Sequence, residues 1–432
     1  MIKKLIQILN QKQKTSLFFL MILTVIAMIL EVASLGLIIP FIQILVEDNL
    51  SPKIVEVFNF LNIYPTSKTQ VLIIILSAVG FLFLLKVIFL TYFSYAQVKL
   101  KTNLKISLSD QLYTKYIMKP YNYHLKNNSS KLIRNIDEIS FVVELIHSVI
   151  TVMLEIVVFL GILLLLLFYE TLGSIFIMLF FGIFGFLFFY KVQIKAKTWG
   201  EARQIHSGLR IRFLREGFRS IKEIKILQRV KEIVKIFTEN NKLLSNYELK
   251  QNFINTLPRL WLEWLVIVGF VFLTIFMIFL GRESNYIVSL LAVFAAASFR
   301  IMPSLTRIMA SIQKIIFYAP TINSTFDEFD KSDSKDLENK SLERKRVIIQ
   351  DRISIKNISF KHSDSSINIF ENLNLEIPVG STVGIFGESG IGKTTLINII
   401  LGLIKPSIGT IEVNGASIYK NIEDWQKQIG YV

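Results

Sequence analysis

Six long apolar runs, separated by polar and mostly basic segments, occupy the first three quarters of the chain. They lie at about 17–46, 71–95, 145–169, 171–190, 260–280 and 286–310. Each run is close to or above the roughly 20 residues that an α-helix needs to cross the hydrocarbon core of a bilayer. The runs on either side of Glu170 are two helices, because one helix of about 45 apolar residues would be about twice as long as that core is thick. The pattern therefore predicts six transmembrane helices.

Basic residues are unevenly distributed among the segments between these runs. Segments 96–144 and 191–257 are rich in Lys and Arg, whereas 47–70, the turn at 170 and 281–285 contain few. Because cytoplasmic loops carry the excess of basic residues, the rich segments and both termini are predicted to be cytoplasmic. The first run is too long for the core of a signal peptide and has no small-residue cleavage site, so it is predicted to be retained.

The polar segments also contain helical periodicity. In 96–118 and 201–257 the apolar residues recur at helical spacing, which predicts that the membrane helices extend into the cytoplasm and turn near 120–130 and 215–225. Residues 51–63 place a polar side chain at every third position, which predicts a short amphipathic helix on the outer membrane surface. That helix is either a lipid-contacting element or a simple connector.

The composition changes sharply after the sixth run. Residues rich in Asp, Ser, Lys and Glu predict a solvated linker. Short apolar segments then predict strands at 347–349, 353–360, 373–377, 383–386 and 409–415. The expected organisation is a transmembrane domain at 1–326, a linker at 327–346 and the N-terminal part of an α/β nucleotide-binding domain at 347–432. The fold class is thus a membrane all-α region with long cytoplasmic extensions, followed by an incomplete α/β P-loop domain.

The segment after the strand at 383–386 matches the phosphate-binding pattern G-x-x-x-x-G-K-[ST] without a mismatch. It consists of Gly387, Glu388, Ser389, Gly390, Ile391, Gly392, Lys393 and Thr394. The glycines allow successive backbone N–H groups to point at phosphate oxygens, at a helix N-terminus whose dipole also favours an anion. Lys393 is predicted to reach the β- and γ-phosphates, Thr394 to bind Mg²⁺ through its hydroxyl and Thr395 to complete the site. The predicted cofactors are ATP and Mg²⁺.

Composition narrows the class of protein further. The chain is 52% hydrophobic with a mean hydropathy of +0.51, which is typical of a protein that lies largely in lipid. Its formal net charge of +15 does not indicate nucleic-acid binding, because the basic residues alternate with long apolar runs. The 432-residue sequence contains no cysteine and only four histidines, so a disulfide framework and a zinc site are not expected.

Several basic residues fall inside the apolar runs, where ionisable side chains are costly and usually functional: Lys86, Arg259, Arg300 and Arg307. Arg300, Arg307 and Lys314 are seven residues apart, so they share one helical face. Three interpretations are open. The bases pair with carboxylates of neighbouring helices, reach out to lipid headgroups, or line a cavity and bind a pyrophosphate. The candidate carboxylates are Glu31, Glu155 and Glu263.

Together these features resemble ATP-binding cassette exporters, in which a six-helix membrane half is fused to a C-terminal ATPase domain. The order of segments carries the resemblance: 358–360, 373–377, the phosphate loop, 409–411, 414–415, Trp425 and 429–432. In the membrane half, 120–124, 128–130, 132–135, 221–225, 294–300 and 303–304 look like flippases of lipid-linked oligosaccharides in bacterial protein glycosylation. The resemblance implies a homodimer in the bacterial inner membrane that moves a polyprenyl-pyrophosphate oligosaccharide to the outer leaflet.

The chain departs from the family pattern in two places. The family stacks adenine on an aromatic residue where this chain has His362, whose ring stacks more weakly than that of Tyr. The family's glutamine switch, signature, acidic magnesium strand, catalytic glutamate and switch histidine would follow Val432, so these residues are expected to form the front portion of a longer ATPase. Two alternatives stay open: a peptide or drug exporter of the same family, and a truncated membrane protein that does not transport and either only binds nucleotide or is inert.

Overall fold

A computed structural model describes residues 7, 9–46, 67–329, 351–361 and 368–432. The chain divides into two compact units, Met1–Tyr113 with Ser130–Asp330 and Thr114–Ser129 with Lys331–Val432. Residues 114–129, expected in the transmembrane domain, thus group with the C-terminal unit. Three expected features lie outside the described residues: the surface helix at 51–63, the strand at 347–349 and His362. The expected linker also lies outside them, apart from 327–329, where the last long helix ends.

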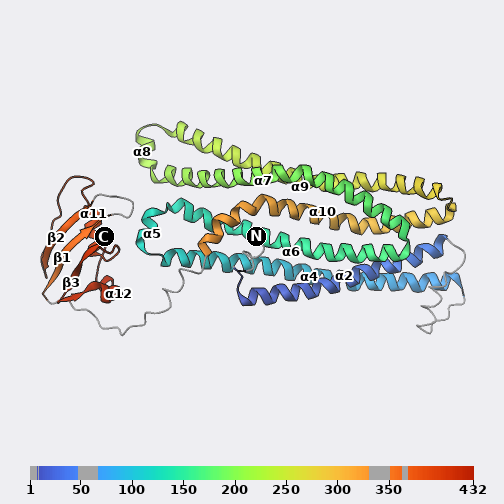
Figure 1. The fold of residues 1–432 in the computed structure, drawn as a ribbon, viewed down its shortest axis with the longest axis horizontal. Coiled ribbons are helices and arrows are strands. Elements are labelled where there is room, and N and C mark those ends of the chain that lie inside the picture. The colour runs from blue at the N-terminus through green and yellow to red at the C-terminus, as the bar shows by residue number, and fades with distance from the viewer. Residues whose placement is uncertain (1–6, 8, 47–66, 330–350, 362–367) are drawn as a thin grey trace. The chain divides into compact units, whose positions relative to one another are not determined.

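Long helices make up the first unit (Figure 1). Each of the six apolar runs lies inside one of them, and most extend well past the run because the adjoining basic segments keep helical periodicity. By length and composition all but α7 are able to cross a membrane, and α7 contains a shorter apolar stretch, Thr171–Leu187. The long helices are α2 (Gln11–Val46), α4 (Lys68–Met118), α6 (Ser129–Tyr169), α7 (Thr171–Arg219), α9 (Val230–Phe279) and α10 (Ser284–Phe329).

The core of this unit lies between α2, α6, α9 and α10. One cluster of buried apolar residues joins the four helices, and it includes Leu35, Ile162, Leu273 and Phe294. Figure 1 shows that α7 and α9 run side by side, joined by the short helix α8 (Ile221–Ile226). The long helices are thus held by apolar packing along much of their length.

At Gly200 the backbones of α7 and α10 approach each other closely. A Cβ atom added there would lie 2.1 Å from the backbone carbonyl oxygen of Phe317. No rotation of a side chain can relieve that contact, because the opposing atom belongs to a helix backbone. Gly200 is therefore required by packing, although glycine is otherwise unfavourable inside a helix.

Replacing Gly200 by Ala is expected to lower the free energy of unfolding by about 1–3 kcal/mol, the usual cost of overpacking. Gly217→Ala is the matched control, because its Cβ would meet only Ile233 Cγ2, at 3.8 Å. The control is expected to be neutral or to stabilise by up to about 1 kcal/mol through helix propensity. Urea unfolding of the purified protein in detergent measures both. Equal stability of the two variants would show that the two backbones can move apart at little cost.

The second unit contains a four-stranded antiparallel sheet in the order β2-β1-β3-β4. Its central strand β1 pairs Ile355 with Leu375 of β2 on one side and with Ile411 of β3 on the other. Asn357 has a φ of +51° where the register shifts. The strands are β1 (Arg352–Phe360), β2 (Phe370–Pro378), β3 (Ile408–Val413) and β4 (Ala416–Ser417).

Short helices pack on this sheet and form a small core. Helix α11 (Lys393–Ile400) contributes Ile399, and α12 (Ile422–Gln426) contributes Trp425, whose indole Nε1 donates to the carbonyl oxygen of Ile400 at 2.9 Å. Tyr121, at the start of the short helix α5 (Tyr121–Lys126), also packs against this core. The core thus holds α11, the helix that begins at Lys393 of the phosphate-binding pattern.

The predicted strand at 383–386 was wrong. These residues have no regular secondary structure, and Phe386 is 94% exposed. A strand needs a neighbour to pair its backbone groups, and none of the described strands lies beside this segment in the sheet order. The apolar sequence is suited to a buried strand, but the described residues supply no strand to cover it.

Candidate functional site

The phosphate-binding segment forms a glycine-rich loop that leads into α11. Gly387, Gly390 and Gly392 have φ values of +154°, +87° and +110°, in the region that favours glycine. Helix α11 begins at Lys393, directly after Gly392. Backbone N–H groups of the loop and of the first helical turn are therefore available to an anion, and the helix dipole adds to the attraction.

The last glycine of the loop also makes a close contact. A Cβ atom at Gly392 would lie 2.4 Å from Ile369 Cγ2 and 3.0 Å from the ring of Phe370. Glycine therefore lets the loop rest against the start of β2, which positions the N-terminus of α11. The end of the loop thus packs against the start of a sheet strand, which holds it in place.

Lys393 lies across the loop. Its Nζ atom donates to the carbonyl oxygens of Gly387 and Glu388, both at 2.7 Å. The ammonium group thereby brings a positive charge to the concave side of the loop, where the β- and γ-phosphates of ATP would be held. The residues fit the phosphates of a nucleotide, and the hydroxyl of Thr394 in the first turn of α11 fits the role of a Mg²⁺ ligand. Among the described residues no cluster of His, Asp and Glu could hold a metal by itself, so such an ion would depend on the nucleotide's own oxygens.

In the membrane helices, basic side chains pair with carboxylates at three levels, and the carboxylate side chains are 2%, 14% and 19% exposed. Glu31 of α2, with a side chain 2% exposed, pairs with Lys86 of α4 at 2.7 Å and with Arg300 of α10 at 2.8 Å. Deeper along α10, Arg307 contacts Glu155 of α6 at 2.5 Å. We call the three levels together the charge column. It consists of Glu31 with Lys86 and Arg300, Glu155 with Arg307, and Glu144 with Lys101 and Lys314.

At the third level of the charge column, Lys314 was predicted to share a face with Arg300 and Arg307, but its partners were not predicted. Glu144 of α6 contacts Lys101 of α4 at 2.6 Å and Lys314 of α10 at 2.7 Å. Lys101 and Glu144 lie outside the apolar runs, so no rule about charges in lipid pointed to them. The α10 base is 21% exposed at Arg300, 43% at Arg307 and 37% at Lys314, so Arg300 is the least exposed of the three.

Arg259 does not join the column. It contacts Glu263 one turn further along α9 at 2.9 Å, and its side chain is 71% exposed. Of the four predicted substrate-binding bases, the structure therefore brings Lys86 and Arg300 together, places Arg307 on the same face of α10, and leaves Arg259 apart. Lys86, Arg300 and Arg307 pair with carboxylates of neighbouring helices, as the first of the three interpretations expects, whereas Arg259 pairs within its own helix.

A second buried charge was missed. Arg203 of α7 is 1% exposed and lies 3.6 Å from Glu138 of α6, with its guanidinium 4.0 Å from the ring centroid of Phe141. Burial lowers the pKa of Arg203, and the nearby Glu138 opposes that effect. No local pattern marked Arg203, because it lies in a segment dense in Arg and Lys.

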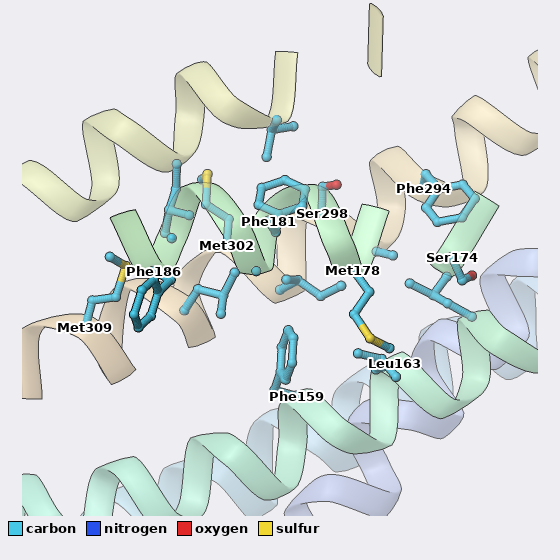
Figure 2. A pocket seen from close by; sticks show the side chains of 18 of the residues that line it. Phe159, Leu163, Ser174, Met178, Phe181, Phe186, Phe294, Ser298, Met302 and Met309 are labelled. Carbon is cyan, nitrogen blue, oxygen red and sulfur yellow. The ribbon is translucent and has the colours of Figure 1, made fainter. Parts of the chain in front are cut away.

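Four helices enclose an apolar cavity of about 400 Å³. Figure 2 shows side chains of α6, α7 and α10 pointing into it, including Phe159, Met178 and Met302. We call this cavity the apolar slot. Its polar lining side chains are Ser174 and Ser298, and Ser174 Oγ is buried without a hydrogen-bond partner among the described residues. The slot is lined by Phe159, Leu163, Leu166, Ser174, Met178, Phe181, Gly182, Gly185, Phe186, Leu262, Val266, Phe294, Ala297, Ser298, Ile301, Met302, Leu305, Met309 and Ile312.

Comparison with family models gives two matches. Residues 11–303 match the model described as the ABC transporter transmembrane region, and residues 370–432 match the model described as ABC transporter. The bacterial Atm1-family ABC exporter with ATP bound has a similar structure, with a TM-score of 0.66 and 12% identity, over 95% of this chain and 70% of that chain. At that identity the likeness concerns the fold alone.

Curated relatives match over shorter stretches. ABC transporter B family member 29, chloroplastic, of Arabidopsis thaliana is 30% identical over 167 residues, 36% of this chain and 26% of the relative. The leukotoxin export ATP-binding protein of Aggregatibacter actinomycetemcomitans is 36% identical over 85 residues, 19% of this chain and 12% of the relative. The chain thus spans about a quarter of the first relative and less of the second.

Proposed function

Because this chain belongs to the ABC transporter family, we propose that it acts as a half-transporter that uses ATP to move an anionic lipid-linked substrate across a bacterial inner membrane. The substrate class we favour is a polyprenyl-pyrophosphate oligosaccharide, moved from the cytoplasmic to the outer leaflet. Two identical copies would assemble, each bringing one phosphate loop. ATP and Mg²⁺ at the loop would drive the change of conformation, with Lys393 and Thr394 as the principal side-chain ligands.

The observation that carries this proposal is the surplus of positive charge in the charge column. Five bases face three carboxylates: Lys86 and Arg300 at Glu31, Arg307 at Glu155, and Lys101 and Lys314 at Glu144. Two positive charges are therefore left over: one at Glu31, inside the apolar runs, and one at Glu144, just outside them. Uncompensated charge inside the apolar runs is costly and usually serves a substrate, and Arg and Lys suit phosphate oxygens.

Peptide export is the second candidate. Two of the relatives are named for what they export or secrete. One is the leukotoxin export protein, and the other is the probable microcin-H47 secretion/processing protein of Escherichia coli. Their similarity spans less than a fifth of this chain. A peptide needs polar partners for its backbone, and the surplus charge of the column favours a compact anion instead.

The test removes the surplus charge without stripping any carboxylate of its partner. In the double variant Arg300→Gln with Lys314→Gln, Glu31 keeps Lys86 and Glu144 keeps Lys101. Flipping of a fluorescent polyprenyl-pyrophosphate oligosaccharide by the full-length protein in vesicles is expected to fall at least about tenfold, equivalent to one lost charge-assisted hydrogen bond.

Arg259→Gln is the control, because it removes one positive charge outside the column. It is expected to flip the lipid at close to the rate of the unmodified protein. Unchanged flipping by the double variant would exclude the charge column as the headgroup site. Export of peptide without any flipping by the unmodified protein would favour the second candidate.

A further inference from the structure

We propose that the apolar slot binds the hydrocarbon chain of the transported lipid while the charge column binds its anionic head. This inference rests on the proposed function and adds a second, separate subsite to it. The slot lies between α6, α7, α9 and α10 within the first unit, and its volume of about 400 Å³ is in the range of ligand sites.

The slot has the length of a membrane-spanning chain. Its lining on α10 extends from Phe294 to Ile312, which is about 27 Å along a helix that rises about 1.5 Å per residue. The hydrocarbon core of a bilayer is about 30 Å thick. An extended chain would follow the whole length of such a slot.

The chemistry of the lining selects hydrocarbon. No charged side chain lines the slot among the described residues, so phosphates, sugars and peptide backbones would be buried there without partners. Met178, Met302 and Met309 contribute flexible thioethers that adapt to an irregular apolar surface. The lining thus suits a long apolar chain and excludes the head of the proposed substrate.

Two glycines of α7 widen the slot. A Cβ atom added at Gly182 or Gly185 would meet no atom within 4 Å, and both residues line the cavity. They lie nearly one helical turn apart, so the missing side chains leave one continuous opening along α7. That opening offers room beside a chain for the methyl branches of a polyprenyl group.

Ser174 provides a polar group at one end. It is 5% exposed, it lines the slot, and its Oγ has no hydrogen-bond partner among the described residues. A buried hydroxyl left unpaired is costly, and a polar atom of a bound ligand would pair with it. Ser174 is three residues after the start of α7 at Thr171, next to the turn predicted to face outside.

Helix α10 connects the two subsites. Its slot-lining residues, such as Phe294, Ile301 and Leu305, lie on one face, and at about 100° per residue Arg300 and Arg307 lie on roughly the opposite face. One helix thus presents a surface for hydrocarbon and a surface for an anion at the same depth. A lipid with one long chain and a charged head has both of the parts that these surfaces would bind.

Photocrosslinking tests the occupant. The 432-residue chain is placed in lipid nanodiscs with a trace of polyprenyl pyrophosphate or of phosphatidylglycerol, each carrying a diazirine on its chain, and labelled peptides are mapped by mass spectrometry. We expect the polyprenyl probe to label Met178, Phe181 and Met302. In Gly182→Leu and Gly185→Leu the Cβ atom meets no atom within 4 Å and the larger side chain is expected to occupy the slot, so each is expected to lower this labelling at least about fivefold.

Gly80→Leu is the matched control, because its Cβ would also meet no atom within 4 Å but the residue lies on α4, outside the slot. It is expected to leave labelling unchanged, and thermal unfolding of all three variants checks that they fold. Equal labelling by phosphatidylglycerol would overturn the assignment to the transported lipid, and so would labelling unaffected by the glycine variants. Slot labelling without flipping by the full-length protein would overturn the proposed function alone.

Discussion

Replacing Lys393 by Ala is expected to weaken nucleotide binding by about 100-fold. The ammonium group is the principal positive charge at the phosphate loop, and a charge-assisted hydrogen bond contributes about 1.5–3 kcal/mol. The substitution also removes the two hydrogen bonds from Nζ to the carbonyl oxygens of Gly387 and Glu388, which hold the loop in its curved form. Titration with a fluorescent ATP analogue in the presence of Mg²⁺ measures the loss directly.

Lys427→Ala is the control for this experiment. Lys427 lies in the same unit and carries the same charge, but it pairs with Asp424 at 3.5 Å, away from the loop. Its removal is expected to leave the affinity within about twofold. If the unmodified chain binds no nucleotide at all, the interpretation as an inert membrane protein gains support. If Lys393→Ala binds as tightly as the unmodified chain, the loop is not the nucleotide site.

Replacing Glu31 by Ala is expected to cost about 3–5 kcal/mol of stability, because it leaves a buried charge without a partner. Glu31 is 1% exposed and serves both Lys86 and Arg300, so its loss strands two positive charges from two other helices. Glu263→Ala is the matched control. It removes a carboxylate from an exposed pair with Arg259, and such pairs contribute about 0–1 kcal/mol.

Unfolding of the purified protein in detergent, followed by circular dichroism, measures both substitutions. A double-mutant cycle sharpens the result, because adding Arg300→Gln to Glu31→Ala removes one of the two stranded charges and should recover part of the stability. A cost for Glu31→Ala no larger than that of Glu263→Ala would mean that water reaches Lys86 and Arg300. The buried cluster would then not hold α2, α4 and α10 together.

The fold class was predictable because its determinants are local and strong. The length of an apolar run decides whether a helix can span lipid, and a phosphate loop is recognisable from the spacing of Gly387, Gly390, Gly392 and Lys393. The family matches and the structure confirm a long helical membrane region followed by a short β-containing ATPase fragment.

What sequence could not predict depends on contacts between distant residues. Lys314 and Glu144 meet across 170 positions, and Arg203 finds Thr321 across 118. The apolar slot arises because four helices do not close around Gly182 and Gly185, which nothing in their local sequence foretells. The strand expected at 383–386 failed for the same reason, since a strand is defined by its neighbour and not by its own residues.

Under the proposed function, the charge column also bears on how the substrate preference of this protein can evolve. Glu31 and Glu144 each hold two bases, so losing either base leaves a neutral pair rather than a bare carboxylate. Single substitutions can therefore lower the surplus charge by one step while the helices stay tied. A related protein could therefore come to prefer a less anionic substrate through substitutions that each leave a folded protein. Loss of Glu31 or Glu144 would instead leave two bases without their carboxylate and destabilise the protein.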